Sequence, residues 1–257
     1  MVVSEKITLI EGSRDVVITV IHNSVKKLKS QPMRVTQDDE KGIMELAVAI
    51  NKETSATVII NNTDIDLNSD EGIKENKELF DEFKKIITKI NPQVIIDLHG
   101  MANSGSLFNN SKESGLRICR EFIEKPSEGS RPDIDIGFRR KASSNFCTSR
   151  GETILRVAKF LSYQGLITDI EAVFPGGSFI GNLACMDRDV MAIEVAKRVR
   201  DNKKLNKKFI DAIINFIDSI RGQAISDEVN TAFGVSKISK PEEVKEELKE
   251  EPAGYIG

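Results

Sequence analysis

The sequence lacks the features that mark membrane-spanning and secreted proteins. No apolar run reaches the roughly 18 residues that a membrane-spanning helix needs. The opening residues MVVSEKITLIEG do not form a cationic start followed by a long apolar stretch, so we expect no secretory signal. Cys119, Cys147 and Cys185 are widely spaced and include no CxxC pair. They predict reduced thiols in a cytoplasmic protein, not a disulfide framework or a cysteine zinc site.

The chain also lacks an excess of either charge. It has 37 Lys and Arg residues against 40 Asp and Glu residues, and the basic residues are spread along its whole length. Nucleic-acid binding needs clustered Lys and Arg, so this distribution argues against it. With 39% hydrophobic residues in 257, the chain is long enough to bury a core of its own.

Short β-branched apolar runs alternate with longer amphipathic stretches, and this pattern is typical of a mixed, mostly parallel sheet flanked by helices. The predicted strands are 7–10, 16–21, 57–61, 94–98, 134–138 and 170–174. The predicted helices are 40–53, 71–90, 112–124, 151–163 and 204–221. Residues 187–200 fit either a helix or a last buried strand. We expect a single α/β domain over 1–239 and a charged tail at 240–257 with little to bury.

The only two histidines of the chain hold matching positions. His22 follows the apolar run VVITVI, and His99 follows VIIDL. Ligands of α/β sheets bind beyond the carboxyl ends of the strands, so two imidazoles at that edge predict a metal site. Two nitrogens and one carboxylate suit zinc, although other divalent ions accept the same ligands.

The third metal ligand is expected among the carboxylates of QDDE at 37–40, where Asp38, Asp39 and Glu40 are candidates. The same residues would also suit the start of a helix, because acidic side chains are favourable there. Asp97 lies two residues before His99, on the same face of a strand. It is either a buried polar residue bonded to the chain or a partner that orients His99.

Two further features are candidates for the chemistry. Glu194 lies inside the apolar run VMAIEV; beside a metal it would act as a general base, whereas on an amphipathic helix it would face solvent. Gly176 and Gly177 follow a predicted strand, where glycines allow either a tight turn or a close approach of the backbone to a ligand. Their spacing is not that of a phosphate-binding loop.

Seven segments of the chain carry a family resemblance, in this order: ITVIHNS at 18–24, DDEKGIMELAVAINKETSATVI at 38–59, DIDLN at 64–68, VIIDLHG at 94–100, PDIDIG at 132–137, FPGGSFI at 174–180 and DVMAIEVAKRV at 189–199. Together they resemble the motifs of the N-formylglutamate amidohydrolases, relatives of the zinc carboxypeptidases with a phosphorylase/hydrolase-like α/β fold. The resemblance extends from about residue 17 to about residue 201.

The resemblance implies a zinc-dependent amidohydrolase that cleaves a linear amide. The zinc ligands would be His22, His99 and an acid of 38–40, for which the family's pattern favours Asp39 ahead of Glu40. Glu194 would be the general base, on a strand. A basic residue would bind the substrate carboxylate, preferably as a bidentate fork. The candidates near the motifs are Arg139, Arg140, Arg150 and Arg188.

The chain departs from the family's pattern at two places. Ile21-His22-Asn23-Ser24 stands where the family has Pro-His-Ser-Gly, and Ser69 stands where the family has an arginine after Asp-Leu-Asn. We therefore interpret the chain as resembling a divergent member of the family. The expected reaction is hydrolysis of an N-formyl or N-acyl amino acid, or of a γ-glutamyl compound. Poly-γ-glutamate hydrolases and carboxypeptidase-like deacylases share the fold and the same class of reaction.

Two other functions stay open. One is a catalytically silent small-molecule binding protein on the same fold, and the other is a structural or regulatory subunit that docks through 240–257. For the enzyme we expect a small acyl-amino-acid-like molecule as the substrate. We expect it to bind neither nucleic acid nor a membrane, and the sequence leaves open whether it forms oligomers.

Overall fold

The computed structural model describes residues 5–22, 40–103, 116–119, 122–124, 131–138, 149–172, 177–183 and 188–232. The chain divides into two compact units, Met1–Arg221 and Gly222–Gly257. The first unit holds the whole described sheet, as expected for a single α/β domain. The tail predicted at 240–257 lies outside the described residues, so its boundary stays a prediction. None of the described helices is long and apolar enough to cross a bilayer.

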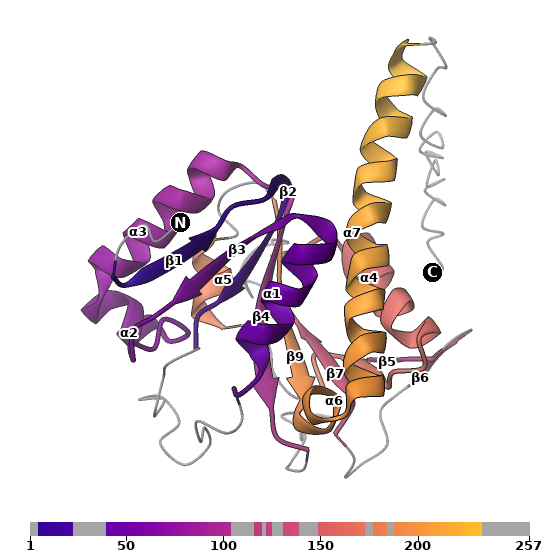
Figure 1. Ribbon diagram of the computed structural model, residues 1–257, viewed down its shortest axis with the longest axis horizontal. Coiled ribbons are helices and arrows are strands. Elements are labelled where there is room, and N and C mark those ends of the chain that lie inside the picture. Colours follow the sequence, from indigo (N-terminus) through magenta and orange to yellow (C-terminus); the bar gives the residue numbers. More distant parts are fainter. Residues whose placement is uncertain are drawn as a thin grey trace, which may run out of the picture. The chain divides into compact units, whose positions relative to one another are not determined.

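Within the described residues, nine strands form one mixed sheet (Figure 1). The strands, in the order in which they lie side by side, are β1 (Ile7–Ile10), β3 (Ala56–Asn61), β2 (Ser13–Val20), β4 (Val94–Met101), β9 (Asp189–Ala196), β7 (Ile134–Gly137), β8 (Thr168–Ile170), β5 (Leu116–Ile118) and β6 (Ile123–Glu124). Strands β3, β2, β4 and β9 are parallel to one another, and β9 and β7 are antiparallel. The carboxyl ends of β2, β4 and β9 therefore meet at one edge.

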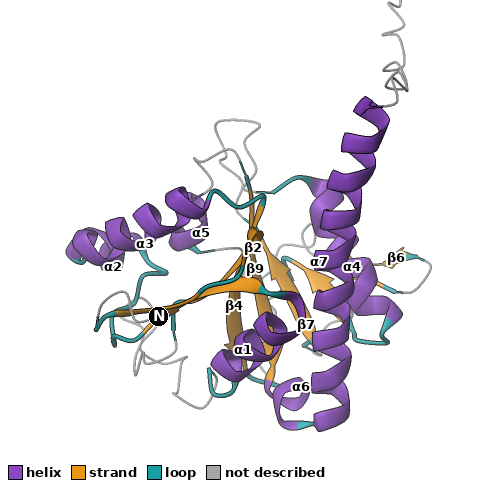
Figure 2. Ribbon diagram, turned by 45° about the horizontal axis from the view of Figure 1, so that its top comes forward, coloured by secondary structure: helices purple, strands orange, loops and turns teal. Residues whose placement is uncertain are grey.

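Helices cover both faces of this sheet (Figure 2). Helices α1 (Ile43–Thr54), α4 (Gly151–Tyr163) and α7 (Lys203–Ala232) contribute buried apolar residues to one core cluster. Helices α3 (Lys77–Ile90) and α5 (Ser178–Leu183) contribute to a second cluster on the other face. In this second cluster the ring of Phe179 makes edge-to-face contacts with the rings of Phe80 and Phe83, which pack α5 against α3.

The alternation of side chains along the central strands decides which face carries the polar residues. In β4, Ile96 and Leu98 join the cluster under α1, whereas Ile95 joins the cluster under α3. Because the side-chain period of a strand is two, Asp97 and His99 lie on the α3 side with Ile95. Glu194 lies on the same side of β9, since Ala192 belongs to the α3 cluster. These three polar residues thus lie on the α3 side of the sheet, beyond its apolar residues and toward the carboxyl ends of β4 and β9.

Most of the predicted elements are confirmed, including the edge strand at 7–10 and the helix at 151–163. In the described part of the ambiguous segment 187–200, residues 189–196 form the strand β9, and the short helix α6 (Lys197–Asp201) follows. The strand predicted at 170–174 begins earlier, as β8 at Thr168–Ile170, and residues 173–174 lie outside the described residues. The helix predicted at 71–90 is divided at Asn76 into α2 (Asp70–Glu75) and α3.

The helix predicted at 112–124 is wrong for the part that the structure describes, which contains β5 and β6. Strand β5 pairs with β8 and brings Arg117 against the buried Asp169, with 2.7 Å between Nε and Oδ1. A second bond joins Nη2 to the other carboxylate oxygen at 3.0 Å. A fork of this kind compensates the burial of Asp169 and favours extended pairing over the local helical pattern.

Candidate metal centre

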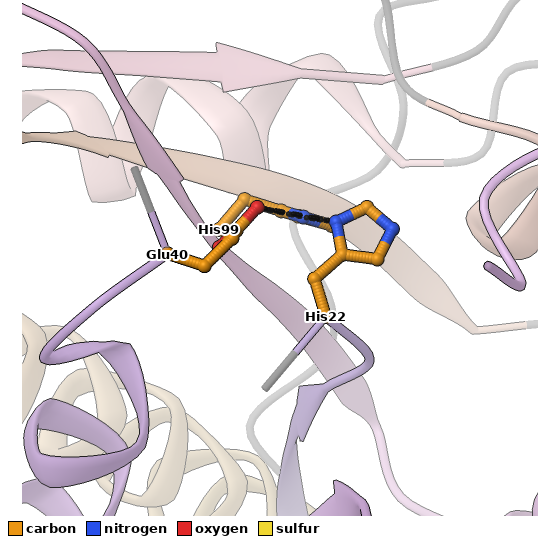
Figure 3. Close-up of side chains that lie close together, drawn as sticks. All are labelled: His22, Glu40 and His99. Atoms are coloured by element: carbon orange, nitrogen blue, oxygen red, sulfur yellow. Dashed lines mark hydrogen bonds and ion pairs between the residues drawn. The ribbon is translucent and has the colours of Figure 1, made fainter. Parts of the chain in front are cut away.

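Three buried side chains from three separate segments meet at the carboxyl edge of the sheet (Figure 3). His22 lies two residues beyond β2, His99 lies near the end of β4, and Glu40 lies just before α1. His22 Nδ1 is 3.1 Å from both Glu40 Oε1 and His99 Nδ1. His99 Nδ1 is 3.8 Å from the same carboxylate oxygen. Three potential ligand atoms therefore face one another.

The spacing of these three atoms fits a metal ion. Zinc binds imidazole nitrogen and carboxylate oxygen at about 2.0–2.2 Å in tetrahedral geometry, which places neighbouring ligand atoms about 3.3–3.6 Å apart. The observed separations of 3.1, 3.1 and 3.8 Å lie on both sides of that range. Two nitrogens and one oxygen leave a fourth position, as in catalytic zinc sites.

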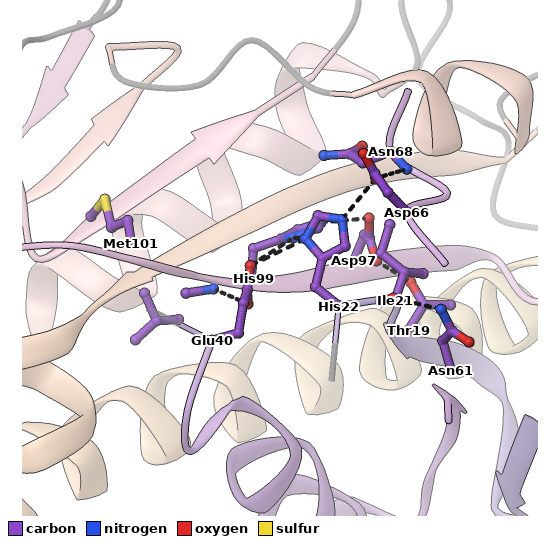
Figure 4. Close-up of polar contacts among 12 residues, drawn as sticks. Thr19, Ile21, His22, Glu40, Asn61, Asp66, Asn68, Asp97, His99 and Met101 are labelled. Atoms are coloured by element: carbon purple, nitrogen blue, oxygen red, sulfur yellow. Dashed lines mark hydrogen bonds and ion pairs between the residues drawn. The ribbon is translucent and has the colours of Figure 1, made fainter. Parts of the chain in front are cut away.

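Carboxylates on the far side of each imidazole fix its orientation (Figure 4). His99 Nε2 is 2.8 Å from Asp97 Oδ2, and the Thr19 hydroxyl donates to Asp97 Oδ1 at 2.6 Å. His22 Nε2 is 3.3 Å from Asp66 Oδ1. With Nε2 engaged in this way, Nδ1 of each ring is the atom left to face the centre. The structure supports the orienting role considered for Asp97.

Glu40 is held by the main chain at one of its oxygens. The Gly100 N–H donates to Glu40 Oε2 at 2.7 Å, which leaves Oε1 directed at the two histidines. Gly42 adopts φ of 87°, a left-handed conformation that glycine accepts without strain. This turn lets the chain pass from Glu40 directly into α1.

The cluster contains more carboxylates than its two histidines can neutralise. Burial lowers the pKa of His22, but hydrogen bonds to Asp66 and Glu40 outweigh burial and raise it to about 9. Burial likewise opposes ionisation of Glu40, but hydrogen bonds from both histidines lower its pKa to about 2. The pKa of His99 rises because Asp97 and Glu194 outweigh its burial. The centre therefore attracts positive charge, and a metal would displace protons from the imidazoles.

Glu194 completes the group from β9. It lies directly opposite His99 in the register of the β4–β9 pair and is buried. Burial, followed by repulsion from Glu40 and Asp135, raises its pKa to about 8, although both histidines oppose the shift. A carboxyl group with such a pKa exchanges a proton near neutral pH, as a general acid–base requires.

The segment DIDLN packs beside Gly177 of the FPGGSFI motif. A Cβ added at Gly177 would lie 1.5 Å from Asn68 Oδ1, so any larger residue would displace the Asn68 side chain. The Asn68 N–H donates to Asp66 Oδ1, the same oxygen that faces His22. Gly177 therefore shapes the wall of the centre through Asn68 and Asp66. Its direct contact with a substrate stays a prediction.

Two of the predicted arginines are engaged away from the centre. Arg150 binds Asp189 at the start of β9, roughly 16 Å along the strand from Glu194. Arg188 donates to Ile87 O and to Asn91 Oδ1 at the end of α3. These contacts favour structural roles for both, because they hold the opposite end of the strand. The other predicted residues, Asp39, Arg139, Arg140 and Gly176, lie outside the described residues.

Asp66 and Thr19 were not predicted as part of the site. Thr19 carries a usable signal, since alternation along β2 places it on the same face as Asp97. Asp66 lies in a loop, and no periodic pattern indicates that it approaches His22.

Solved structures with a similar fold include the N-formylglutamate amidohydrolase from Ralstonia eutropha JMP134, with a TM-score of 0.56 and 13% identity over 86% of this chain and 100% of that chain. Weaker likenesses include gene product Atu2144 from Agrobacterium tumefaciens (TM-score 0.45, 11% identity, 87% of this chain and 94% of that one). Another is N-acetylmuramoyl-L-alanine amidase from Clostridium difficile 630 (0.39, 12%, 80% and 97%). No protein-family model and no curated protein sequence matches the chain. The likeness to the first of these structures confirms the predicted fold class, a hydrolase-like α/β fold.

Proposed function

We propose that this protein is a metal-dependent hydrolase of a linear amide, with zinc or another divalent ion held by His22, Glu40 and His99. The observation that carries the proposal is the convergence of two Nδ1 atoms and one carboxylate oxygen beside the buried Glu194. We favour Glu40 over Asp39 as the third ligand because its Oε1 faces both histidines. The likeness in fold to an N-formylglutamate amidohydrolase is consistent with this class of reaction.

The chemistry follows from the separate roles of these side chains. A bound ion would polarise the scissile carbonyl and lower the pKa of a water molecule toward about 7. Glu194 would accept a proton from that water and deliver it to the leaving amine nitrogen, which its raised pKa suits. Asp97 and Asp66 would keep both imidazoles oriented throughout, because each holds the ring nitrogen that faces away from the centre.

Ser69 bears on how a substrate carboxylate could be bound. Its hydroxyl accepts a hydrogen bond from the Gly72 N–H at 3.0 Å and caps α2, where the resembled family has an arginine. A substrate carboxylate would therefore need another cation. Arg139 and Arg140, which lie outside the described residues, stay predicted candidates for that cation. We propose an N-acyl amino acid or a γ-glutamyl compound as the substrate.

The loss of that arginine also favours a second candidate function, a binding protein that keeps the centre without turnover. The two functions differ at Glu194. In an enzyme its carboxyl group is required for turnover, whereas in a binding protein its replacement leaves the function unchanged.

Metal content of the purified protein tests the proposal. We expect about one zinc per chain in the wild type, lost in His22→Ala, His99→Ala and Glu40→Ala, and kept in Asp39→Ala and Glu194→Gln. If the wild type binds no divalent ion after incubation with zinc, manganese or iron, the metal-dependent mechanism is wrong. Stoichiometric metal without turnover of any formyl- or acyl-amino acid, or of any γ-glutamyl compound, would favour the binding protein.

A further inference from the structure

A buried arginine on α6 contacts the segments that carry the candidate metal centre. Arg200 is 8% exposed, and its guanidinium donates to three main-chain carbonyls. Nε donates to Val195 O at 3.1 Å, Nη2 donates to Met101 O at 3.2 Å, and Nη1 donates to Lys41 O. Two of these partners are 99 and 159 residues away in the sequence. One side chain therefore joins three distant parts of the chain.

Each of these carbonyls belongs to a segment that carries a residue of the centre. Lys41 directly follows Glu40, and Val195 directly follows Glu194. Met101 is the second residue after His99, at the end of β4. The guanidinium thus holds the three segments that bring a metal ligand, a second metal ligand and the proposed general base to the edge of the sheet.

The residues between these carbonyls and the centre are braced as well. The Gly100 N–H donates to Glu40 Oε2, so a second contact links the segments already joined through Lys41 and Met101. The left-handed turn at Gly42 packs near the stem of Arg200, since a Cβ added there would lie 3.9 Å from Arg200 Cβ. A change in the position of the guanidinium would therefore move Glu40 relative to β4.

Arginine suits this task because its planar group presents five N–H donors in fixed directions. A lysine would keep the charge and most of the apolar stem, but its single nitrogen cannot reach three carbonyls in the same geometry. We propose that Arg200 is a positioning residue, which sets the spacing between Glu40, His99 and Glu194. Its effect on metal binding rests on the proposed function, whereas its effect on the spacing does not need a metal.

Metal-free protein gives the first test, by NMR. The two imidazoles are the only ones in the chain, so their nitrogen signals are unambiguous, and the Gly100 amide reports the contact with Glu40. In Arg200→Lys and Arg200→Ala we expect both imidazole signals to shift and Gly100 exchange to rise at least about tenfold relative to Ile95 and Ile96. The matched control is Arg188→Ala, which loses arginine-to-carbonyl bonds at the end of α3 and should change neither signal.

Zinc titration of the same variants gives the second test. We expect affinity for Zn²⁺ to fall about 10- to 100-fold in Arg200→Lys, as for lost supporting contacts of metal sites, and to stay within about twofold in Arg188→Ala. Unchanged imidazole and Gly100 signals in Arg200→Lys, or equal changes in the control, would overturn the inference. So would a failure of both Arg200 variants to fold, since the residue would then act on the whole domain. A wild type that binds no Zn²⁺ would refute the proposed function and leave the NMR result to decide on Arg200.

Discussion

Strand β9 carries a buried carboxyl group near each end, and the two differ in their hydrogen bonds and in their pKa values. Asp189, at its start, accepts hydrogen bonds from the Arg150 main chain and guanidinium and from the Thr153 hydroxyl. Although burial opposes it, these bonds lower the pKa of Asp189. Glu194 has no hydrogen bond from a cation among the described residues, and burial raises its pKa to about 8.

The difference separates structural carboxylates from reactive ones. A carboxylate neutralised by its own protein ties two elements together, and its charge is fixed over a wide range of pH. A carboxyl group buried beside two histidines and other acids changes its charge near neutral pH, which costs stability and provides a proton acceptor. On one strand, the first kind lies at the amino end and the second kind lies at the edge where ligands bind.

The largest effect is expected at the reactive end. Glu194→Gln keeps the shape of the side chain but removes the proton acceptor, so turnover should fall about 10²- to 10⁴-fold. Zinc content and the melting temperature should not decrease, because the substitution removes a buried ionisable group. Steady-state kinetics, metal analysis and thermal unfolding check the three quantities. Full activity in Glu194→Gln would assign the proton transfer to another residue.

The metal-free protein should lose stability as pH rises, and Glu194 should account for part of the loss. Its folded pKa is raised from 4.5 to about 8, so its contribution is complete below pH 4.5 and lost toward pH 8. His22, raised from 6.5 to about 9, contributes below pH 6.5 and loses its contribution toward pH 9. We expect the free energy of unfolding of chelator-treated protein to decrease by up to about 6 kcal/mol between pH 6 and 9. Urea unfolding measures it, and a curve of the same depth in Glu194→Gln would contradict the assignment.

Arg150→Ala tests the structural end. The buried Asp189 would keep its bonds from the main chain and Thr153 but lose its cation, at a cost of about 1–2 kcal/mol in the free energy of unfolding. Turnover and zinc content should match those of the wild type. A specific rise in KM with unchanged stability would instead place Arg150 at the substrate.

The smallest effect is expected from Thr153→Val, which removes only the hydroxyl that donates to Asp189 Oδ2 at 2.7 Å. The free energy of unfolding should fall by about 0.5–1.5 kcal/mol, since the remaining donors still hold Asp189. Denaturant unfolding at pH 7 measures the change. Kinetic constants that differ from those of the wild type would show that the two ends of β9 are coupled.

The sequence predicts the positions of both histidines because β-branched apolar runs locate the strands that carry them. For Glu194 the pattern fits either a strand or a helix, and only the family resemblance favours the strand. Which acid of 38–40 faces the histidines depends on where the turn at Gly42 begins, and three neighbouring carboxylates do not reveal that. The roles of Arg150 and Arg188 depend on partners 39 and 101 residues away. Arg200 has no local signal at all, because its partners are main-chain carbonyls.

The pairing of β4 with β9 has a consequence for how the chain tolerates change in length. Val94 pairs with Asp189, and His99 pairs with Glu194. In both strands the residue of the centre therefore lies five positions after the first paired residue. Deleting one residue within either stretch would turn every later side chain to the opposite face. Substitutions of the apolar residues between these pairs should therefore be accepted wherever the volume is kept. Insertions or deletions of a single residue there should eliminate the site while leaving the composition of the core almost unchanged.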